Sequence, residues 1–237
     1  MMKLRSSRLT VAVLAAAAVI LIAGGVATAS NMGFKLNKAL IFQGVAGSQV
    51  GKNWTSLPFN SPYPNVAALC SQTGLAAPPS PLPARVTILN DSGPLIGTFS
   101  SALCGSSGAS SILLLPGRGA QIQQPAGTGN LTSIIIVGSH NPTLALTVLK
   151  AASGQQGNFW FSIPYHTTAT TVRDLCIQAG LSSVGLPATV TRLNATTGLF
   201  SAPLCGSPAA GTTSLVLGEF VQIRDPGGPK TFIPAHF

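Results

Sequence analysis

Residues that could act as acids or bases are few in this chain. Its 237 residues include three His and only four Asp or Glu. Hydrolytic catalysis needs a base that is held by an orienting group beside a nucleophile, and glycoside hydrolysis needs a pair of carboxylates. The candidates are scattered and form no such motif, so we expect no enzyme activity, no catalytic residue and no cofactor. The candidate acids and bases are His140, His166, His236, Asp91, Asp174, Glu219 and Asp225.

Four cysteines are the other reactive groups of the chain. An even number of cysteines in an exported protein predicts disulfides, and the absence of a Cys-x-x-Cys pair argues against a metal site. Three pairings are possible. The internal repeat described below favours Cys70–Cys104 and Cys176–Cys205, because each repeat then holds its own bridge. In the chain-entropy model, loops of about 30 residues give roughly 3–4 kcal/mol per bridge.

The first thirty residues have the pattern of a secretory signal peptide. Three basic residues lie within the first eight, an apolar run follows from Val11 to Ile22, and small residues stand at Ala27-Thr28-Ala29. This pattern predicts that residues 1–29 are removed and that the mature chain begins at Ser30. The alternative is an uncleaved anchor, because Thr10 to Ala29 is long enough to span a bilayer. We expect a secreted or cell-surface protein that contacts the membrane only through this segment, if it is retained.

The composition favours a turn-rich β protein with a sparse positive charge. Only 7% of the residues are charged, 46% are hydrophobic, and the formal net charge is +9. These values exclude a disordered charged chain, and the 26 Gly and 18 Pro argue against a helical bundle. The basic residues are dispersed, so we do not expect nucleic-acid binding. A weak attraction to an anionic glycan is compatible with this charge.

An internal duplication covers the chain after the signal peptide. Matching segments recur in the same order, which predicts two homologous units at residues 30–141 and 142–237. The clearest matches are Ser56-Leu57-Pro58-Phe59 with Ser162-Ile163-Pro164-Tyr165, Val86-Thr87-Ile88-Leu89-Asn90 with Val190-Thr191-Arg192-Leu193-Asn194, and Leu103-Cys104-Gly105 with Leu204-Cys205-Gly206.

Each unit is predicted to be mainly antiparallel β, in an α+β arrangement with one short helix. Helix caps are expected at Asn65 and Thr171, and the helices should end near Gly74 and Gly180. Whether the sheets form a sandwich or a half-open barrel stays open. The strands expected in the first unit are Phe34–Ile41, Trp54–Phe59, Arg85–Leu89, Leu95–Ser100, Ser111–Leu115 continuing through Gly117 to Ile122, and Thr132–Val137, and the first two recur at Leu144–Lys150 and Phe159–Tyr165.

The segment Asn53-Trp54-Thr55-Ser56-Leu57-Pro58, with the later Leu115-Pro116-Gly117-Arg118-Gly119, resembles a group of bacterial secreted proteins. Those proteins carry β-rich domains, often in tandem, with the pattern N-x-x-S-L-P … P-G-x-G. The opening Asn31 to Asn37 and the closing Ile233 to Phe237 are also similar to them. The resemblance implies a cell-surface or extracellular protein of unassigned activity, and it transfers no catalytic residue.

We therefore expect a non-enzymatic secreted or cell-envelope structural protein that associates with itself or with other envelope components. The strands at Ser133–Val137 and Ser111–Leu115 carry almost no Lys, Glu or Pro, the residues that protect exposed sheet edges. In one version of this hypothesis, the strand Gly33–Ile41 adds to the sheet of a neighbouring molecule.

The alternative function is an extracellular module that binds a glycan or another surface ligand. Aromatic side chains stack on sugars and are also frequent in strand cores. The candidate ligand contacts are Trp54, Trp160 and Tyr165.

Overall fold

A computed structural model describes residues 33–41, 51–75, 83–90, 97–124, 131–148, 158–194, 199–227 and 229–235. Gly33–Phe237 form one compact body. The predicted signal peptide and its cleavage site, together with Asp91 and His236, lie outside the described residues. No helix in the described ranges has the length and apolar character needed to cross a membrane.

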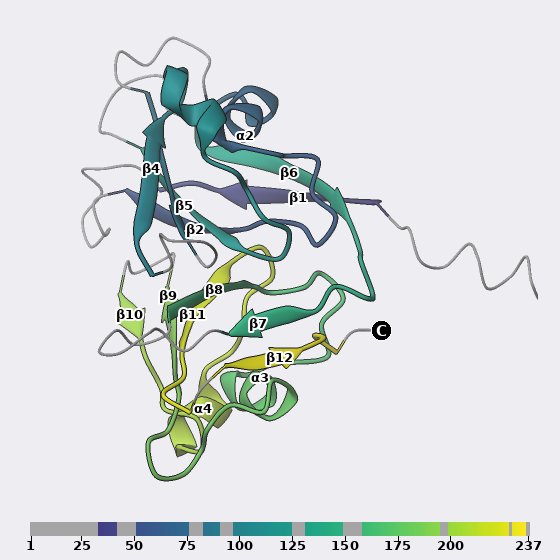
Figure 1. Cartoon of the computed structure of the whole chain (residues 1–237), viewed down its shortest axis with the longest axis vertical. Helices are drawn as coiled ribbons and strands as arrows, with labels where there is room; N and C mark the ends of the chain where they lie inside the picture. The colour runs from purple at the N-terminus through teal and green to yellow at the C-terminus, as the bar shows by residue number, and fades with distance from the viewer. Residues whose placement is uncertain are drawn as a thin grey trace, which may run out of the picture. The chain divides into compact units, whose positions relative to one another are not determined.

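The two halves of this body repeat one order of elements (Figure 1). The first half contains β1 (Gly33–Ala39), β2 (Lys52–Ser56), α2 (Val66–Thr73), β3 (Arg85–Leu89), β4 (Phe99–Leu103), the short 3-10 helix η2 (Ser107–Ser111), β5 (Gly119–Gln123) and β6 (Ser133–Ser139). The second half contains β7 (Leu146–Val148), β8 (Asn158–Ser162), α3 (Val172–Gln178), β9 (Thr189–Leu193), β10 (Phe200–Ser201), α4 (Pro208–Thr212), β11 (Phe220–Arg224) and β12 (Lys230–Phe232).

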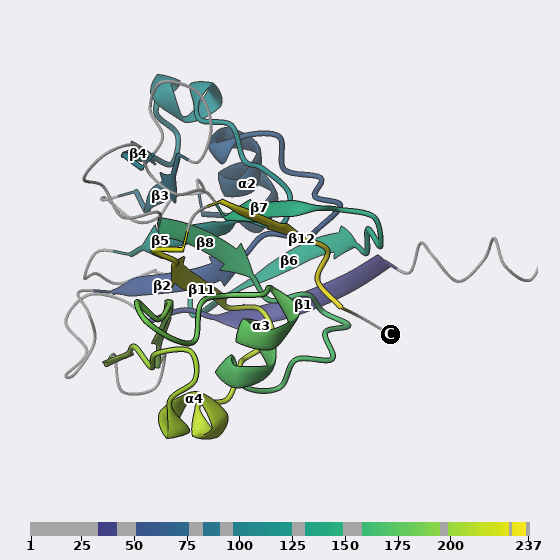
Figure 2. The ribbon, with the colours of Figure 1, turned by 60° about the horizontal axis from the view of Figure 1, so that its bottom comes forward.

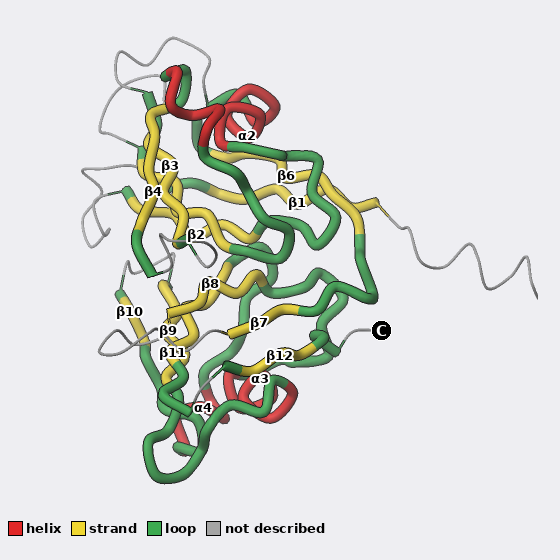
Figure 3. Tube along the Cα trace, in the orientation of Figure 1, coloured by secondary structure: helices red, strands yellow, loops and turns green. Residues whose placement is uncertain are grey.

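The strands of each half form the same two antiparallel sheets. The first half has a four-stranded sheet in the order β2-β5-β3-β4 and the pair β1-β6, and the second half has β8-β11-β9-β10 and the pair β7-β12. The helices lie at opposite ends of the body, with the strands between them (Figures 2 and 3). The predicted fold class, mainly β with two similar units, is therefore confirmed.

Local sequence signals account for the two longer helices. The Asn65 side chain accepts a hydrogen bond from Ala68 N at 2.9 Å, and α2 ends at Gly74, which has φ of 79°. Thr171 and Asp174 form the expected capping box at the start of α3. Side-chain oxygens at these positions satisfy first-turn amides that have no partner within the helix.

Two strand expectations in the first half are correct only in part. The expected continuation from Gly117 to Ile122 is found as β5 (Gly119–Gln123), and Phe99 and Ser100 lie in β4. Ser111–Leu115 is not a strand, because Ser107–Ser111 form η2 and Leu113 makes only an isolated bridge to Asn65. Small side chains such as the buried Ala109 let the chain turn tightly there. The edge strand runs over Phe99–Leu103 rather than Leu95–Ser100, and Leu95 itself lies outside the described residues. Each half thus has a second helical turn, η2 or α4, that we did not predict.

Both predicted disulfides are present. Cys70 bonds to Cys104 and Cys176 bonds to Cys205. Each disulfide connects the helix of its half to the turn that follows the edge strand. The two halves are therefore cross-linked at equivalent positions.

Each half has its own apolar core, and a third cluster lies between them. This seam cluster consists of Trp54, Leu89, Trp160, Leu193 and Phe220. The Phe220 ring stacks with Trp54 at a centroid distance of 4.4 Å and with Trp160 at 4.6 Å. The two four-stranded sheets are therefore joined by stacked aromatic rings rather than by a loose contact.

Phe220 and Gly119 occupy equivalent positions in the two halves and contact each other. Phe220 begins the pairing of β11 with Ser162, and Gly119 begins the pairing of β5 with the equivalent Ser56. A Cβ atom on Gly119 would lie 2.8 Å from Phe220 Cβ and closer still to the ring. The first half therefore needs glycine here because the second half fills the space with phenylalanine.

Other contacts across the seam are reciprocal. Phe200 packs on Trp54 at 5.4 Å, and the equivalent Phe99 packs on Trp160 at 5.5 Å. Ser56 N donates to Gly218 O at 3.1 Å, and in the same way Ser162 N donates to Gly117 O at 3.0 Å. The halves are thus related by an approximate two-fold arrangement.

The seam contact predicts a sharp difference between two glycine substitutions. Gly119→Ala should lower the free energy of unfolding by about 1–3 kcal/mol, because the added methyl group overlaps the buried Phe220 ring. Gly108→Ala is the matched control, since no atom lies within 4 Å of its added Cβ. Urea unfolding of both variants checks this, and an unchanged midpoint for Gly119→Ala would contradict the packing described here.

Candidate functional site

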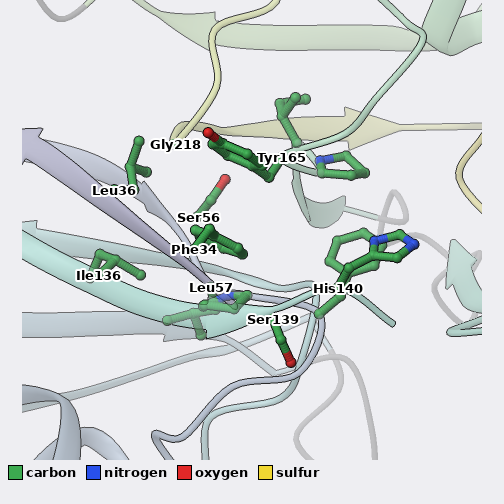
Figure 4. Close-up of a pocket in the computed structure, with 13 residues that line it drawn as sticks. Phe34, Leu36, Ser56, Leu57, Ile136, Ser139, His140, Tyr165 and Gly218 are labelled. Carbon is green, nitrogen blue, oxygen red and sulfur yellow. The ribbon is translucent and has the colours of Figure 1, made fainter. Parts of the chain in front are cut away.

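A groove runs along the seam between the halves (Figure 4). Strands β1 and β6 line it with Phe34, Leu36 and Ile136, and the segments after β2 and β8 contribute Pro58 and Tyr165 among others. Its enclosed part is about 20 Å³, which is room for about one water molecule. The groove is therefore shallow, and a ligand larger than a water molecule would lie over it rather than inside it.

Aromatic rings form one rim of the groove. Phe34 and Tyr165 stack with a centroid distance of 4.9 Å and an interplanar angle of 3°. His166 meets Tyr165 edge-on at 4.8 Å, and His140 lies edge-on to His166 at 5.9 Å. Tyr165 is 43% exposed, whereas its equivalent Phe59 in the first half is buried. The rim therefore presents a polar aromatic side chain to solvent on one side of the seam.

A buried ion pair joins the two halves close to this groove. Lys38 Nζ lies 3.0 Å from Glu219 Oε1, and both residues are buried. Arg192 Nε lies 3.8 Å from the other carboxylate oxygen. Glu219 directly follows Gly218, which lines the groove. Burying charges is unfavourable unless they are paired, so this carboxylate ties β1 of the first half to the second half.

The predicted ligand contacts are found in two different environments. Trp54 and Trp160 are each 5% exposed and belong to the seam cluster. Their indole nitrogens donate to the equivalent Gln121 and Gln222 at 3.4 and 3.2 Å. Only Tyr165 lies at the groove. The structure therefore does not bring these three side chains together on one surface.

Among the described residues, the groove is lined by apolar and aromatic side chains together with Ser56, Ser139 and His140. Asn60 Nδ2 donates to Ser139 Oγ at 2.8 Å, and no carboxylate is among the lining residues.

Asp174 accepts hydrogen bonds from Thr171 and Thr170, which hold the pKa of its carboxyl below its usual value. Asp225 is paired with Lys230 at 3.3 Å. Within the described ranges, no three His, Cys, Asp or Glu side chains cluster closely enough to hold a metal ion.

The outer edge of β4 is a second candidate site. β4 pairs with β3 on one side, and no other described strand pairs with it. Cys104 N donates to Ala84 O and Asn90 N donates to Thr98 O. In an antiparallel ladder this register directs the backbone groups of Phe99 and Ser101 away from β3. The described strands thus leave this edge open.

The equivalent edge in the second half is shorter. β10 contains only Phe200 and Ser201, and Pro203 stands where the first half has Ala102. Proline has no N–H to donate to the neighbouring strand, so the regular pairing stops. In the sequence repeat Pro203 falls opposite Ala102, and a proline at a strand position is a signal for a shortened strand.

The Lys38–Glu219 pair was not found by sequence analysis. The two residues are 181 positions apart, and neither belongs to a motif. Glu219 stands where the first half has Arg118, whose guanidinium lies 4.2 Å from the centre of the Phe159 ring. The only sequence signal for this ion pair was that an acid, Glu219, stands at the repeat position where the first half has a base, Arg118.

No family model, no curated protein and no solved structure matches the chain. Its function is therefore inferred from its own residues.

The buried pair predicts a strong and non-additive effect of its two partners on stability. Glu219→Gln should lower the free energy of unfolding by about 3–5 kcal/mol, because the charge of Lys38 stays buried without its counter-ion. Adding Lys38→Met should recover part of that loss, since neither charge of the pair then remains. Chemical denaturation of the two single variants and the double variant measures this coupling, and strictly additive losses would contradict it.

Proposed function

We propose that this protein is a non-enzymatic secreted or cell-surface structural protein that associates with itself through the outer edge of β4. The observation that carries the proposal is the difference between the two halves at this position. The first half has a regular five-residue edge strand, whereas Pro203 limits the equivalent strand to two residues.

The chemistry of β4 supports strand pairing. Its sequence Phe99-Ser100-Ser101-Ala102-Leu103 contains no charged residue and no proline. Natural edge strands avoid intermolecular pairing through charges, prolines, bulges or very short length, and β4 has none of these. Phe99 is also 59% exposed. A second β4 strand can add to this edge by antiparallel main-chain hydrogen bonds.

Export is supported by the covalent structure. The chain holds two disulfides, and the described residues contain no free cysteine. Disulfides of this kind persist in oxidising compartments outside the cytosol. The signal-peptide pattern and the resemblance to bacterial secreted tandem-repeat proteins point to the same location.

Addition of the N-terminal strand to a neighbour is the less favoured form of assembly. β1 pairs with β6 of its own chain over all seven residues, from Gly33↔Ser139 to Ala39↔Ser133. Lys38 is also bound to Glu219. Strand donation would break both sets of contacts, whereas pairing through β4 breaks none of them.

The edge hypothesis predicts that charge at the centre of β4 controls assembly. In antiparallel pairing about a two-fold axis, Ser101 of one copy lies opposite Ser101 of the other. Ser101→Glu should shift the oligomer to monomer, because like charges directly opposite are destabilising. The stability of the chain should be kept, since Arg85 already donates to the Ser101 side chain within the chain. Light scattering after size-exclusion chromatography measures the shift.

Two controls separate edge pairing from other effects of a new charge. Ala202→Glu places the same carboxylate at the equivalent position of the second half and should leave the oligomer unchanged. An equimolar mixture of Ser101→Glu and Ser101→Lys chains should associate again, because opposite charges then face each other. A wild-type chain that stays monomeric at every concentration would overturn the proposal.

The groove supports a second candidate function, the binding of an extended surface ligand such as an anionic glycan. The observation that favours it is the exposed Tyr165 ring beside a shallow apolar groove. Tyr165→Ala should then weaken the binding of anionic oligosaccharides by about tenfold, the loss expected for one aromatic contact. Calorimetric titration with an oligosaccharide panel tests this, and equal affinities of wild type and variant would exclude the groove.

A further inference from the structure

Two cations that are far apart in the sequence share one row of the first four-stranded sheet. Lys52 on β2 and Arg85 on β3 both stand opposite Gln123 of β5. Lys52 comes two residues before Trp54, and side chains two positions apart along a strand point to the same face. Arg85 is exposed and Lys52 is half-buried. The row is therefore the next one along the sheet face from the seam cluster.

A third cation lies in the equivalent row of the second half. Arg224 on β11 is exposed and stands opposite Asn158 of β8 and Thr189 of β9. It comes two residues after Gln222, which pairs with Trp160. Arg224 therefore has the same place relative to its tryptophan as the first row has relative to Trp54.

The two rows lie at the same end of the seam. β2 and β8 are hydrogen-bonded to the opposite half at their last residues, Ser56 and Ser162, so their first residues both lie at the other end. The Trp54 and Trp160 rings are 6.4 Å apart, and each cation row is roughly 7 Å further along its sheet. β2 and β5 both contact β11 across the seam (Figure 1). The two rows therefore form one surface that both halves build.

Each pair of equivalent positions in these rows carries one cation and one neutral polar side chain. The pairs are Lys52 with Asn158, Arg224 with Gln123, and Arg85 with Thr189. Because like charges that face each other are destabilising, this distribution keeps three positive charges apart on one surface. Amide and hydroxyl groups stand between the charges.

No carboxylate of the described residues neutralises these cations. Glu219 and Asp225 are buried in ion pairs with other basic residues. Asp225 follows Arg224 in the sequence, but consecutive residues of a strand point to opposite faces. Asp174 caps α3, whose Val172 packs in the core on that opposite face. The surface is therefore complementary in charge to an anionic partner.

The spacing of the charges favours a linear anionic glycan as the partner. Neighbouring strands are about 4.8 Å apart, so Lys52 and Arg85, with one strand between them, are about 10 Å apart at the backbone. Charges on alternate sugars of a linear polysaccharide have a similar spacing, and amides and hydroxyls can bond sugar hydroxyl groups. Single-stranded nucleic acid is less favoured, because its bases stack on exposed aromatic rings and both tryptophans beside the rows are buried.

We infer that Lys52, Arg85 and Arg224 form a binding site for a linear glycan that carries a uronic acid carboxylate on alternate sugars. The three cations pair with carboxylates, and the neutral side chains between them bond hydroxyl groups of the sugars. This site is separate from the seam groove, whose lining contains none of the three cations. The inference does not rest on self-association through β4.

Calorimetric titration of the exported, disulfide-intact chain with an octasaccharide of alternating glucuronic acid and N-acetylglucosamine tests the inference. We expect binding that weakens as salt is raised, because exposed charges are screened. An uncharged N-acetylglucosamine oligomer of the same length should not bind. The double variant Lys52→Gln/Arg85→Gln should weaken binding of the octasaccharide about tenfold, the loss expected for two exposed ion pairs, and should reduce its dependence on salt.

The double variant Lys35→Gln/Arg173→Gln is the matched control. It removes two exposed cations from other surfaces and gives the same net charge, so it should bind the octasaccharide like wild type. Equal affinities of the two double variants would overturn the inference, as would equal binding of the charged and uncharged oligomers or no binding by wild type.

Two further outcomes would overturn the inference and identify another mode of binding. A loss of octasaccharide binding in Tyr165→Ala, with full binding in Lys52→Gln/Arg85→Gln, would assign the glycan to the seam groove. Tighter binding of a single-stranded oligonucleotide than of the octasaccharide would identify nucleic acid as the partner of this surface.

Discussion

The close approach of Phe220 to the backbone of Gly119 is the constraint on which the rest of the structure depends. It brings the two four-stranded sheets together so that Phe220 stacks with both tryptophans. Neither half can bury its own tryptophan alone, because Trp54 and Trp160 lie on the sheet faces that meet at the seam. The duplication therefore produces one body with a shared aromatic cluster in addition to two separate cores.

The features on which the proposed functions rest arise where the two copies differ. Glu219 replaces the equivalent Arg118 and buries a carboxylate beside Lys38. Pro203 shortens one sheet edge, while Ala102 leaves the other regular. Exposed Tyr165 replaces buried Phe59 at the groove. A symmetric repeat would have two equivalent sheet edges and two equivalent groove rims. Because of these few substitutions, the protein has one regular sheet edge and one rim with an exposed tyrosine.

Sequence reasoning succeeded where the signal was local or repeated. Arg85–Leu89 is a strand with the predicted bounds, the helix caps are those expected, and the repeat identified both disulfides. It could not place Trp54 and Trp160, because their burial depends on residues of the other half. The tight turn at Ser107–Ser111 was missed because short polar side chains fit a strand, a turn or a helix equally well. The Lys38–Glu219 pair has no local pattern, since its partners are joined only by the fold.

The central claim is that the two halves are one cooperative unit held together at the seam. Native-state hydrogen exchange, followed by mass spectrometry of peptides that cover β5 and β11, tests it most directly. Amides in both strands should exchange through a common opening, with equal free energies that fall together in denaturant. Protection that is lost in one strand while the other stays closed would show that the halves unfold independently and would contradict the account.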